Sequence, residues 1–509
     1  MIKSGIKLTI LTLLCFTLNP IDCRSQVKAP LLNFTLPKSD DHYKCVKDYV
    51  EDKIDTDYNH ASAAAIEAFK DIKYGVRIHW GLYSIEGKGK ESWPFLTLSD
   101  KKKQAYQDLY KTWNPTGFDA EEWMRLFSEN GIKMFTITTM HHEGFSMFDT
   151  KARVKRRVNW IAPGGPKIED CDMAFSIMET PFHRDVIKEL CDAAHKYGIK
   201  IDLYFSHPNW FNVDFRPYNY HPVQIPDVKI HPKLYGDAPS QRYIVAPDPT
   251  PNEEARMMAN HRQQLTELLT NYGKIDMICL DQWLGSKVWP QMRQEMKDFR
   301  KIQPEVMFRA RGIGNYGDYY TPEGFIPGND ENTDMPWFVI YPYGESFSYL
   351  KTDHFKGVAW IISSLTDIVA KGGNFMVGIG PDGSGRFEPR VIQALKEAGK
   401  WLKVNGEAIY STRPREGDLW KEGESIRFTR TKDKKTVYAI VRGWPGQKLR
   451  VKSVEPVHGT EIFMLGYPKP LNWNYDKITG LEISLPVELQ DMDKRPCKFA
   501  WSFKIASLN

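Results

Sequence analysis

Residues 184–205 read RDVIKELCDAAHKYGIKIDLYF. Apolar side chains recur at helical spacing over residues 184–197, and Gly198 follows them directly, which predicts a helix that ends at this glycine. Residues 199–205 are a short, mainly apolar run and predict a buried strand. A helix, a glycine and an apolar strand in succession form the repeating unit of a parallel sheet in α/β proteins.

The same unit recurs along the chain. The other helix–strand pairs lie at residues 61–79, 118–138, 255–280 and 355–379, the last three with a glycine between helix and strand. A small sheet would not use so many units. Their span predicts a (β/α)8-type, TIM-like barrel over residues 65–411.

The chain changes character after about residue 411. Six runs with period-two alternation follow, separated by turn residues: SIRFTR, TVYAIVRG, LRVKSV, EIFML, LEISL and KFAWSFKI. They predict an antiparallel β-sandwich over residues 412–509. Residues 26–64, which precede the barrel, are polar and mixed, and we expect them to form an arm that packs on it.

The N-terminus has the composition of a secretory signal peptide. Lys3 and Lys7 precede an uncharged apolar run, residues 8–18, that is too short to cross a membrane. Cleavage after Ser25 is predicted, which makes residues 1–25 the signal peptide and the mature protein periplasmic or extracellular, without a membrane span. Cys23 would allow a lipoprotein anchor instead, but the preceding aspartate fits a lipobox poorly.

The remaining composition narrows the class of protein. A formal net charge of +5 over 509 residues leaves no strongly basic domain for nucleic acid. The cysteines beyond the signal peptide are scattered and form no CxxC pair, which argues against a disulfide framework and against a zinc site. The sequence leaves the oligomeric state open.

Polar side chains cluster where the predicted strands end. In a barrel the carboxyl ends of the strands converge on one cavity, and long βα loops surround it, here residues 206–252 and 312–354. The side chains at these ends are His79, His141, His142, Glu143, Tyr204, Ser206, His207, Trp210 and Asp281. Four such sets meeting in one cavity predict an active site.

Six segments resemble glycoside hydrolase family 29, the α-L-fucosidases. They are YGVRIHWGLYS (74–84), FDAEEWMRLFSENGIKMFTITTMHHEGFSMFDTK (118–151), HRDVIKELCDAAHKYGIKIDLYFS (183–206), IDMICLDQW (275–283), KGGNFMVGIGPDGSG (371–385) and GKWLKVNGEAIYSTRP (399–414). Each motif alone is weak, but the six are collinear over about residues 65–415. The resemblance implies a retaining enzyme that removes terminal α-L-fucose from glycans without a cofactor or metal.

The resemblance also implies a catalytic pair. Asp281 matches the family nucleophile, which forms a glycosyl-enzyme intermediate that water then hydrolyses. The family places its acid/base variably. Glu323 in GDYYTPEGFIP is our candidate, because it follows Arg311 at a distance that resembles some members. Glu143 and Glu91 are the alternatives, and the acid should occupy the drier position because burial favours the protonated form.

The substrate-binding residues that the resemblance implies are His79, Trp93, His141, His142, Tyr204 and Arg311. Imidazoles both donate and accept hydrogen bonds, which suits the fucose hydroxyls. The tryptophan resembles an aromatic that packs on the sugar, and the arginine one that contacts it. A zinc site at the three histidines is the competing interpretation, but neither an HExxH motif nor a cysteine partner supports it.

Three departures from the family pattern leave the sugar open. Glu91, Ser92 and Trp93 stand where members often carry Glu-Trp-Tyr, so the glutamate that would bind the axial hydroxyl is displaced or missing. Cys279 replaces a frequent aromatic, and Gly378 replaces the usual asparagine. One alternative is the same chemistry on another L-sugar, such as α-L-galactose or a substituted fucose. The other is a non-catalytic carbohydrate-binding protein.

A basic run follows the His-His loop: Lys151, Arg153, Lys155, Arg156 and Arg157. Such a run is usually a solvated loop. The alternative is a subsite for an acidic or sulfated glycan, because arginine forks match oxyanions.

Overall fold

The structure is a computed structural model that describes residues 35–37, 46, 49–216, 221–223, 249–323, 326–327 and 333–508. The predicted signal peptide and the alternative lipoprotein site at Cys23 lie outside these ranges, so export stays a prediction. Within these ranges, none of the helices has both the length and the apolar content needed to cross a membrane.

The unit at residues 184–205 folds as predicted, with a helix followed by a strand. They are α6, Val186–Tyr197, and β5, Lys200–Ser206. The Asp185 side chain caps the helix by accepting a hydrogen bond from the Lys188 backbone N–H at 2.9 Å. Gly198 ends the helix with φ 65°, a left-handed conformation that glycine adopts without a Cβ clash.

Within the described ranges, seven parallel strands form the main sheet, in the order β7–β6–β5–β2–β1–β9–β8. Besides β5 they are β1 Tyr74–Ile78, β2 Met134–Met140, β6 Met277–Asp281, β7 Met307–Phe308, β8 Phe338–Pro342 and β9 Asn374–Ile379. Apart from the outermost residues of β5 and β8 these strands are buried, because helices cover the sheet outside and side chains fill the barrel inside.

An irregular segment, residues 319–323, closes the sheet between its edge strands β7 and β8. Isolated parallel bridges join Tyr319 to Arg309 after β7, and Tyr320 and Glu323 to residues 337 and 340 at β8. The Tyr319 carbonyl accepts from the residue 310 backbone N–H at 2.8 Å. This eighth position completes the ring and confirms the predicted (β/α)8-type barrel.

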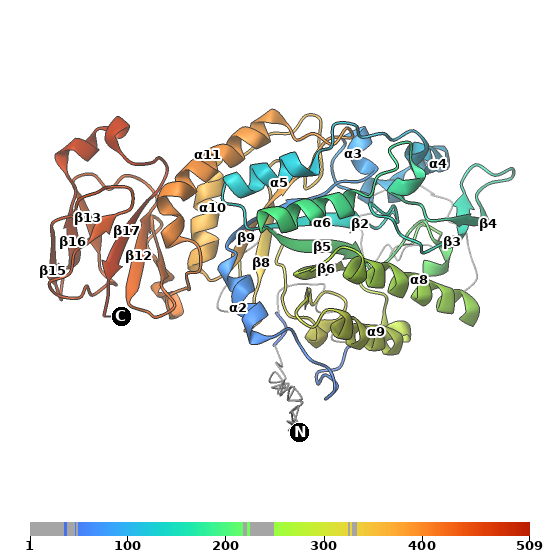
Figure 1. Ribbon diagram of the computed structural model, residues 1–509, viewed down its shortest axis with the longest axis horizontal. Coiled ribbons are helices and arrows are strands. Elements are labelled where there is room, and N and C mark those ends of the chain that lie inside the picture. The colour runs from blue at the N-terminus through green and yellow to red at the C-terminus, as the bar shows by residue number, and fades with distance from the viewer. Residues whose placement is uncertain are drawn as a thin grey trace, which may run out of the picture.

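Helices line the outside of the barrel (Figure 1). They are α5 Ala120–Glu129, α8 Pro251–Thr270, α9 Trp289–Ile302, α10 Val358–Ala370 and α11 Pro389–Asn405, together with α6. The loops after β1 and β2 carry α3 Tyr83–Glu86, α4 Asp100–Gln107 and the antiparallel hairpin of β3 Val154–Asn159 and β4 Lys167–Met173. The basic run at residues 151–157 was expected to be a solvated loop, but part of it lies in β3. Both strands of the hairpin carry charged side chains on exposed and half-exposed positions, so no apolar alternation marked them.

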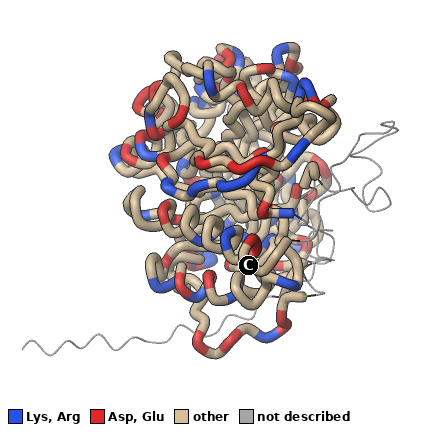
Figure 2. Tube along the Cα trace, turned by 90° about the vertical axis from the view of Figure 1, so that its right-hand side faces the viewer, with Lys and Arg blue, Asp and Glu red and all other residues tan. Residues whose placement is uncertain are grey.

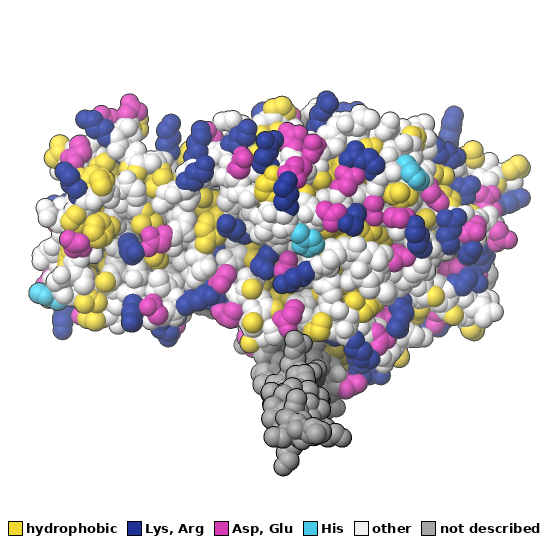
Figure 3. Space-filling model, viewed as in Figure 1, with side chains coloured by type: hydrophobic (Ala, Val, Ile, Leu, Met, Phe, Trp, Pro, Cys, Tyr) yellow, Lys and Arg dark blue, Asp and Glu magenta, His cyan; other side chains and the backbone are white. Residues whose placement is uncertain are grey.

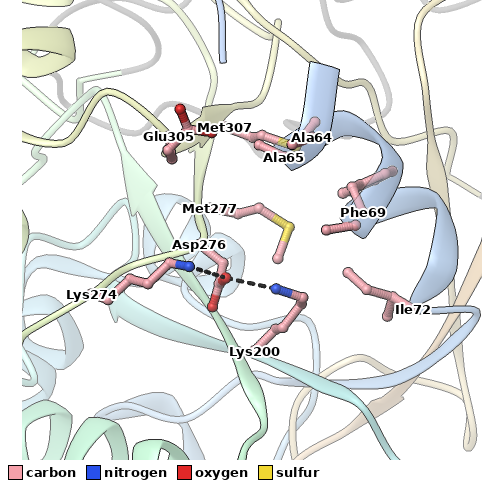
Figure 4. Close-up of a pocket in the computed structure, with 11 residues that line it drawn as sticks. Ala64, Ala65, Phe69, Ile72, Lys200, Lys274, Asp276, Met277, Glu305 and Met307 are labelled. Carbon is pink, nitrogen blue, oxygen red and sulfur yellow. Dashed lines mark hydrogen bonds and ion pairs between the residues drawn. The ribbon is translucent and has the colours of Figure 1, made fainter. Parts of the chain in front are cut away.

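Helix α2, Ala63–Asp71, closes the base of the barrel. Its Phe69 ring packs against Tyr319 and Phe338, with ring centroids 5.3 and 6.2 Å away. A cavity of about 210 Å3 lies between this helix and the first residues of β5, β6 and β7 (Figure 4). Asp276 in its wall pairs with Lys200 at 2.9 Å. This cavity is at the end of the barrel opposite to Asp281.

The buried Asp318 carboxylate joins the segment before α2 to the barrel. It accepts hydrogen bonds from the backbone N–H groups of Ala61 at 3.1 Å and Phe308 at 2.7 Å. Its other partners are His60 Nδ1, at 2.9 Å, and the buried Arg300 guanidinium of α9. Three separate segments, at residues 60–61, α9 and β7, therefore meet at this one carboxylate.

Replacing Asp318 with alanine is expected to lower the free energy of unfolding by about 3–5 kcal/mol, because Arg300 would remain as a buried charge without its carboxylate. The urea midpoint measures the change. Asp57→Ala is the control: that carboxylate lies at the surface, 2.8 Å from Lys297, and its loss should leave the midpoint unchanged. Equal midpoints for the two variants would show that the buried pair is not needed.

The C-terminal residues form the predicted antiparallel sandwich. One sheet has the order β10–β11–β12–β17–β14 and the other β13–β16–β15. The strands are β10 Lys421–Glu422, β11 Ile426–Arg430, β12 Thr436–Val441, β13 Lys448–Val451, β14 Phe463–Met464, β15 Trp473–Asp476, β16 Gly480–Ser484 and β17 Trp501–Ala506. The Trp401 indole of α11 donates to the Ala500 carbonyl at 2.8 Å, which ties the sandwich to the barrel.

Candidate active site

The predicted site residues meet at the carboxyl ends of the strands. His79 follows β1, the pair His141–His142 follows β2, and Tyr204 lies near the carboxyl end of β5. Asp281 ends β6, and Glu323 ends the segment that closes the barrel. Parallel strands bring these five positions to one rim, as the barrel prediction requires.

The Asp281 carboxylate is buried, with an exposed fraction of 7%. The Tyr204 hydroxyl donates to its Oδ2 at 2.7 Å, and Arg311 Nη1 donates to its Oδ1 at 2.8 Å. His142 Nε2 lies 3.8 Å from Oδ2. Burial raises the pKa of Tyr204 well above its usual value, and the neighbouring carboxylate adds to the shift, so the phenol keeps the proton that it donates. The carboxylate is thus fixed in position by donors on both oxygens.

The Glu323 side chain is 40% exposed and shares a donor with Asp281. Arg311 Nη1 lies 2.9 Å from Glu323 Oε1 and 2.8 Å from Asp281 Oδ1. The two oxygens are therefore at most about 5.7 Å apart, which is below the carboxyl separation of about 6.5–9.5 Å in inverting glycosidases and is compatible with the separation of about 5–5.5 Å in retaining ones.

A hydrogen-bonded chain connects His142 to Asp281. His142 Nδ1 lies 2.8 Å from the Ser206 hydroxyl, which lies 3.0 Å from the Tyr204 hydroxyl. The His141 ring stacks on Tyr204 with centroids 5.5 Å apart. These contacts set the orientation of both rings before any ligand binds.

His79 and His141 are neutral near pH 7. Burial lowers the pKa of His79 well below its usual value, and the adjacent Arg77 guanidinium lowers it further. Burial, followed by the neighbouring His142, does the same to the pKa of His141. A neutral imidazole has one donor and one acceptor nitrogen, which suits sugar hydroxyls. In the part of the chain that the structure describes, no three His, Cys, Asp or Glu side chains are grouped so that they could hold a metal ion.

Trp93 provides a half-buried aromatic wall. It begins a short 3-10 helix, Trp93–Thr97, and its ring meets His142 edge to face at 4.8 Å. Trp210 packs against it at 5.4 Å and is itself buried. Ser92, next to the wall, lies 2.5 Å from His141 Nδ1. Neither Ser92 nor Trp210 was a predicted site residue, although Trp210 was noted at the end of its strand.

The alternative acids, Glu143 and Glu91, are buried. Burial raises the pKa of Glu143 to about 8 and that of Glu91 to about 7. Glu91 Oε1 accepts from the Ser348 backbone N–H at 2.9 Å, and Glu143 Oε2 lies 3.7 Å from His141 Nδ1. Proton affinity alone would favour either one as the acid. Geometry favours Glu323, because it shares a donor with Asp281.

The basic run of residues 151–157 is paired with carboxylates. The pairs are Lys151–Asp149 at 2.6 Å, Arg153–Asp172 at 2.9 Å, Lys155–Asp172 at 2.8 Å, Arg157–Glu169 at 2.8 Å and Arg156–Glu253. Figure 2 shows basic and acidic stretches running side by side across this end of the molecule. Basic and acidic side chains are also interspersed over the face in Figure 3. The cations of the run are thus already engaged, which removes the main support for an anion subsite there.

Profiles of two protein families match the sequence. The α-L-fucosidase profile matches residues 46–407, and the α-L-fucosidase C-terminal domain profile matches residues 421–506. The tissue α-L-fucosidase of Mus musculus is 28% identical over 480 residues, covering 87% of this chain and 92% of that protein. The tissue α-L-fucosidase of Homo sapiens is 29% identical over 471 residues, covering 86% of this chain and 89% of that protein.

Solved structures share the fold. The α-L-fucosidase isoenzyme 1 from Paenibacillus thiaminolyticus has a TM-score of 0.69 at 22% identity, covering 87% of this chain and 99% of that one. A trapped covalent intermediate of a family 29 α-L-fucosidase from Bacteroides thetaiotaomicron has a TM-score of 0.68 at 22% identity, covering 88% and 97%. The family profile spans more than half of this chain, and the chain therefore belongs to the α-L-fucosidase family.

Proposed function

We propose that the protein is a retaining, exo-acting α-L-fucosidase that hydrolyses terminal α-L-fucose from fucosylated glycans, with Asp281 as nucleophile and Glu323 as acid/base. The observation that carries this proposal is the shared donor: one guanidinium nitrogen of Arg311 bonds both carboxylates, at 2.8 and 2.9 Å. That geometry keeps the two carboxyls closer together than in inverting enzymes, which need space for an extra water between carboxyl and sugar.

In the first step, Asp281 attacks the anomeric carbon while Glu323 gives its proton to the glycosidic oxygen. The bond from the anomeric carbon to that oxygen breaks, and its electron pair leaves with the aglycone. Tyr204 and Arg311 hold the attacking carboxylate, so little reorganisation is needed at the moment of attack.

In the second step, Glu323 acts as a base. It takes a proton from water while the water oxygen attacks the anomeric carbon, and the bond to Asp281 breaks with its electron pair returning to the carboxylate. The exposure of the Glu323 side chain, 40%, supports this role because water must reach it. The histidines His79, His141 and His142 and the Trp93 ring would hold the sugar.

The alternative of another L-sugar rests on Glu91. Its carboxyl is engaged with the Ser348 backbone, so it is not simply available to an axial hydroxyl. The alternative of a non-catalytic binding protein has less support, because a binding site does not require two carboxylates on one donor.

The test is hydrolysis of 4-nitrophenyl α-L-fucoside, followed by NMR of the first-formed sugar. We expect α-L-fucose to appear first and to mutarotate later. First formation of the β anomer would refute the retaining mechanism. The α-L-galactoside, which adds one hydroxyl at C6, is the matched substrate: turnover of this substrate alone would move the specificity to the alternative sugar.

A further inference from the structure

We propose that Arg309, which rests on the Cys279 thiol, is a positioning residue that couples the charge states of Asp281 and Glu323 and so sets the pH range in which the pair works. This inference rests on the proposed function of the same site. It adds a residue that no motif in the sequence pointed to and that need not contact the sugar.

Arg309 contacts both carboxylates, Asp281 and Glu323. Its side chain is completely buried, and its Nη2 lies 3.0 Å from Glu323 Oε1 while Nη1 lies 3.4 Å from Asp281 Oδ1. Arg311 bonds the same two oxygens. Each reacting carboxyl therefore has an oxygen between two guanidinium groups, and the pair is linked through both arginines.

The Cys279 side chain contacts the Arg309 guanidinium and supports it from β6. It lies two residues before Asp281 on β6, so both side chains face the same side of the strand. Arg309 Nη1 lies 3.7 Å from its sulfur, and Arg77 Nη1 lies 3.1 Å from it. The Leu280 carbonyl also accepts from Arg309, at 3.4 Å. A small side chain at position 279 is what leaves space for two guanidinium groups in the barrel.

Cys279 also contacts Arg77, which packs on the second donor to Asp281, Tyr204. The Arg77 guanidinium lies over the Tyr204 ring, 4.7 Å from its centroid, and the Tyr204 hydroxyl donates to Asp281. Burial raises the pKa of the Cys279 thiol, so it remains neutral and adds no charge of its own. A neutral, compact group thus separates Arg77 from Arg309.

Several titratable groups surround the pair. Beyond Arg309 and Arg311 they are Arg77, His79, Glu91, His141, His142, Tyr204 and His207. Burial lowers the pKa values of His79 and His207 well below the usual range, so neither is a cation near pH 7. Arg309 and Arg311 are permanent positive charges next to the pair, so removing one of them changes the electrostatic environment of both carboxyls directly.

Arg309→Gln is expected to move both limbs of the kcat/KM pH profile upward by about 0.5–1 pH unit. A guanidinium partner favours the ionised carboxylate. Without it, Asp281 ionises only at higher pH, which moves the acidic limb, and Glu323 keeps its proton to higher pH, which moves the basic limb. The value of kcat/KM at the optimum should fall about 10- to 100-fold as the pair loses its alignment.

The test uses the full chain, 4-nitrophenyl α-L-fucoside and five further variants. Arg309→Lys keeps one charge but not the fork, and should give a smaller shift. Cys279→Ser keeps a small polar side chain under the Arg309 guanidinium and should give the wild-type pH profile. Cys279→Phe should displace the guanidinium and reproduce the Arg309→Gln profile. Arg262→Gln, an arginine on α8 paired with Asp298 at 2.7 Å, is the control for loss of an arginine elsewhere.

The fifth, Glu323→Gln, completes a double-mutant cycle. In that background the cost of Arg309→Gln should fall at least about threefold, because one of the two coupled carboxylates no longer carries charge. Unchanged limbs in Arg309→Gln, or an equal cost in both backgrounds, would overturn the inference. If Arg309→Gln does not fold, Arg309→Lys and Cys279→Phe decide in the same way. A wild type without activity on the fucoside would instead overturn the proposed function.

Discussion

Asp281→Ala is expected to lower kcat/KM on 4-nitrophenyl α-L-fucoside by about 10⁴-fold or more, the scale seen when a residue that forms a covalent intermediate is deleted. The carboxylate is held by Tyr204 at 2.7 Å and by Arg311 at 2.8 Å, and an alanine leaves both donors without their acceptor. No glycosyl-enzyme can then form. Initial rates over a range of substrate concentrations measure the loss.

Azide separates loss of the nucleophile from general damage to the site. In Asp281→Ala, azide can enter the space of the missing carboxylate and attack the anomeric carbon directly, so the fucosyl azide should have the inverted, β configuration. Asp276→Ala is the matched control: this aspartate precedes the other end of β6, where it pairs with Lys200 at 2.9 Å, and it should remain active. An azide product of α configuration would contradict the role of Asp281.

The position of Asp281 could be predicted because one sequence feature marks both the strand and the site residue at its end. An apolar run that stops at a carboxylate gives the strand, its end and the residue at the rim. The strand at residues 374–379 agrees with β9 residue for residue because glycines bound this mainly apolar run on both sides. By contrast, the hairpin β3–β4 is held by charge pairs between strands, and the segment that closes the barrel is held by isolated bridges; neither produces an apolar period.

The histidines and Tyr204 were identified from a family resemblance and the structure brings them together; their substrate-binding roles stay predictions. Arg309 was missed although a signal existed: it lies two residues before Arg311, and residues at that spacing in an extended chain face the same side. The sequence does not show which carboxylates the two arginines contact. That both arginines reach Asp281 and Glu323 depends on how segments 307–311 and 319–323 meet, which is a tertiary contact.

Glu323→Ala is expected to lower kcat/KM by about 10²–10⁴-fold for substrates with a poor leaving group and much less for 2,4-dinitrophenyl α-L-fucoside. A poor leaving group needs a proton as its bond breaks, whereas dinitrophenolate leaves without one. The basic limb of the pH profile should also disappear, because that limb reports the loss of the proton from the acid. Kinetics on a series of aryl fucosides measures the dependence on the leaving group.

Azide gives the complementary result for this variant. With the nucleophile intact, the glycosyl-enzyme still forms from the dinitrophenyl substrate, and azide then displaces Asp281, so two inversions should yield the α-fucosyl azide. Glu143→Gln and Glu91→Gln are the matched variants. Burial raises the pKa of both carboxyls, as a general acid requires, but neither shares the Arg311 donor with Asp281 in the way that Glu323 does. If either one, and not Glu323→Ala, showed the leaving-group dependence and the α azide, the acid/base would have to be reassigned to it. The proximity of Glu323 to Asp281 would then reflect only their common arginines.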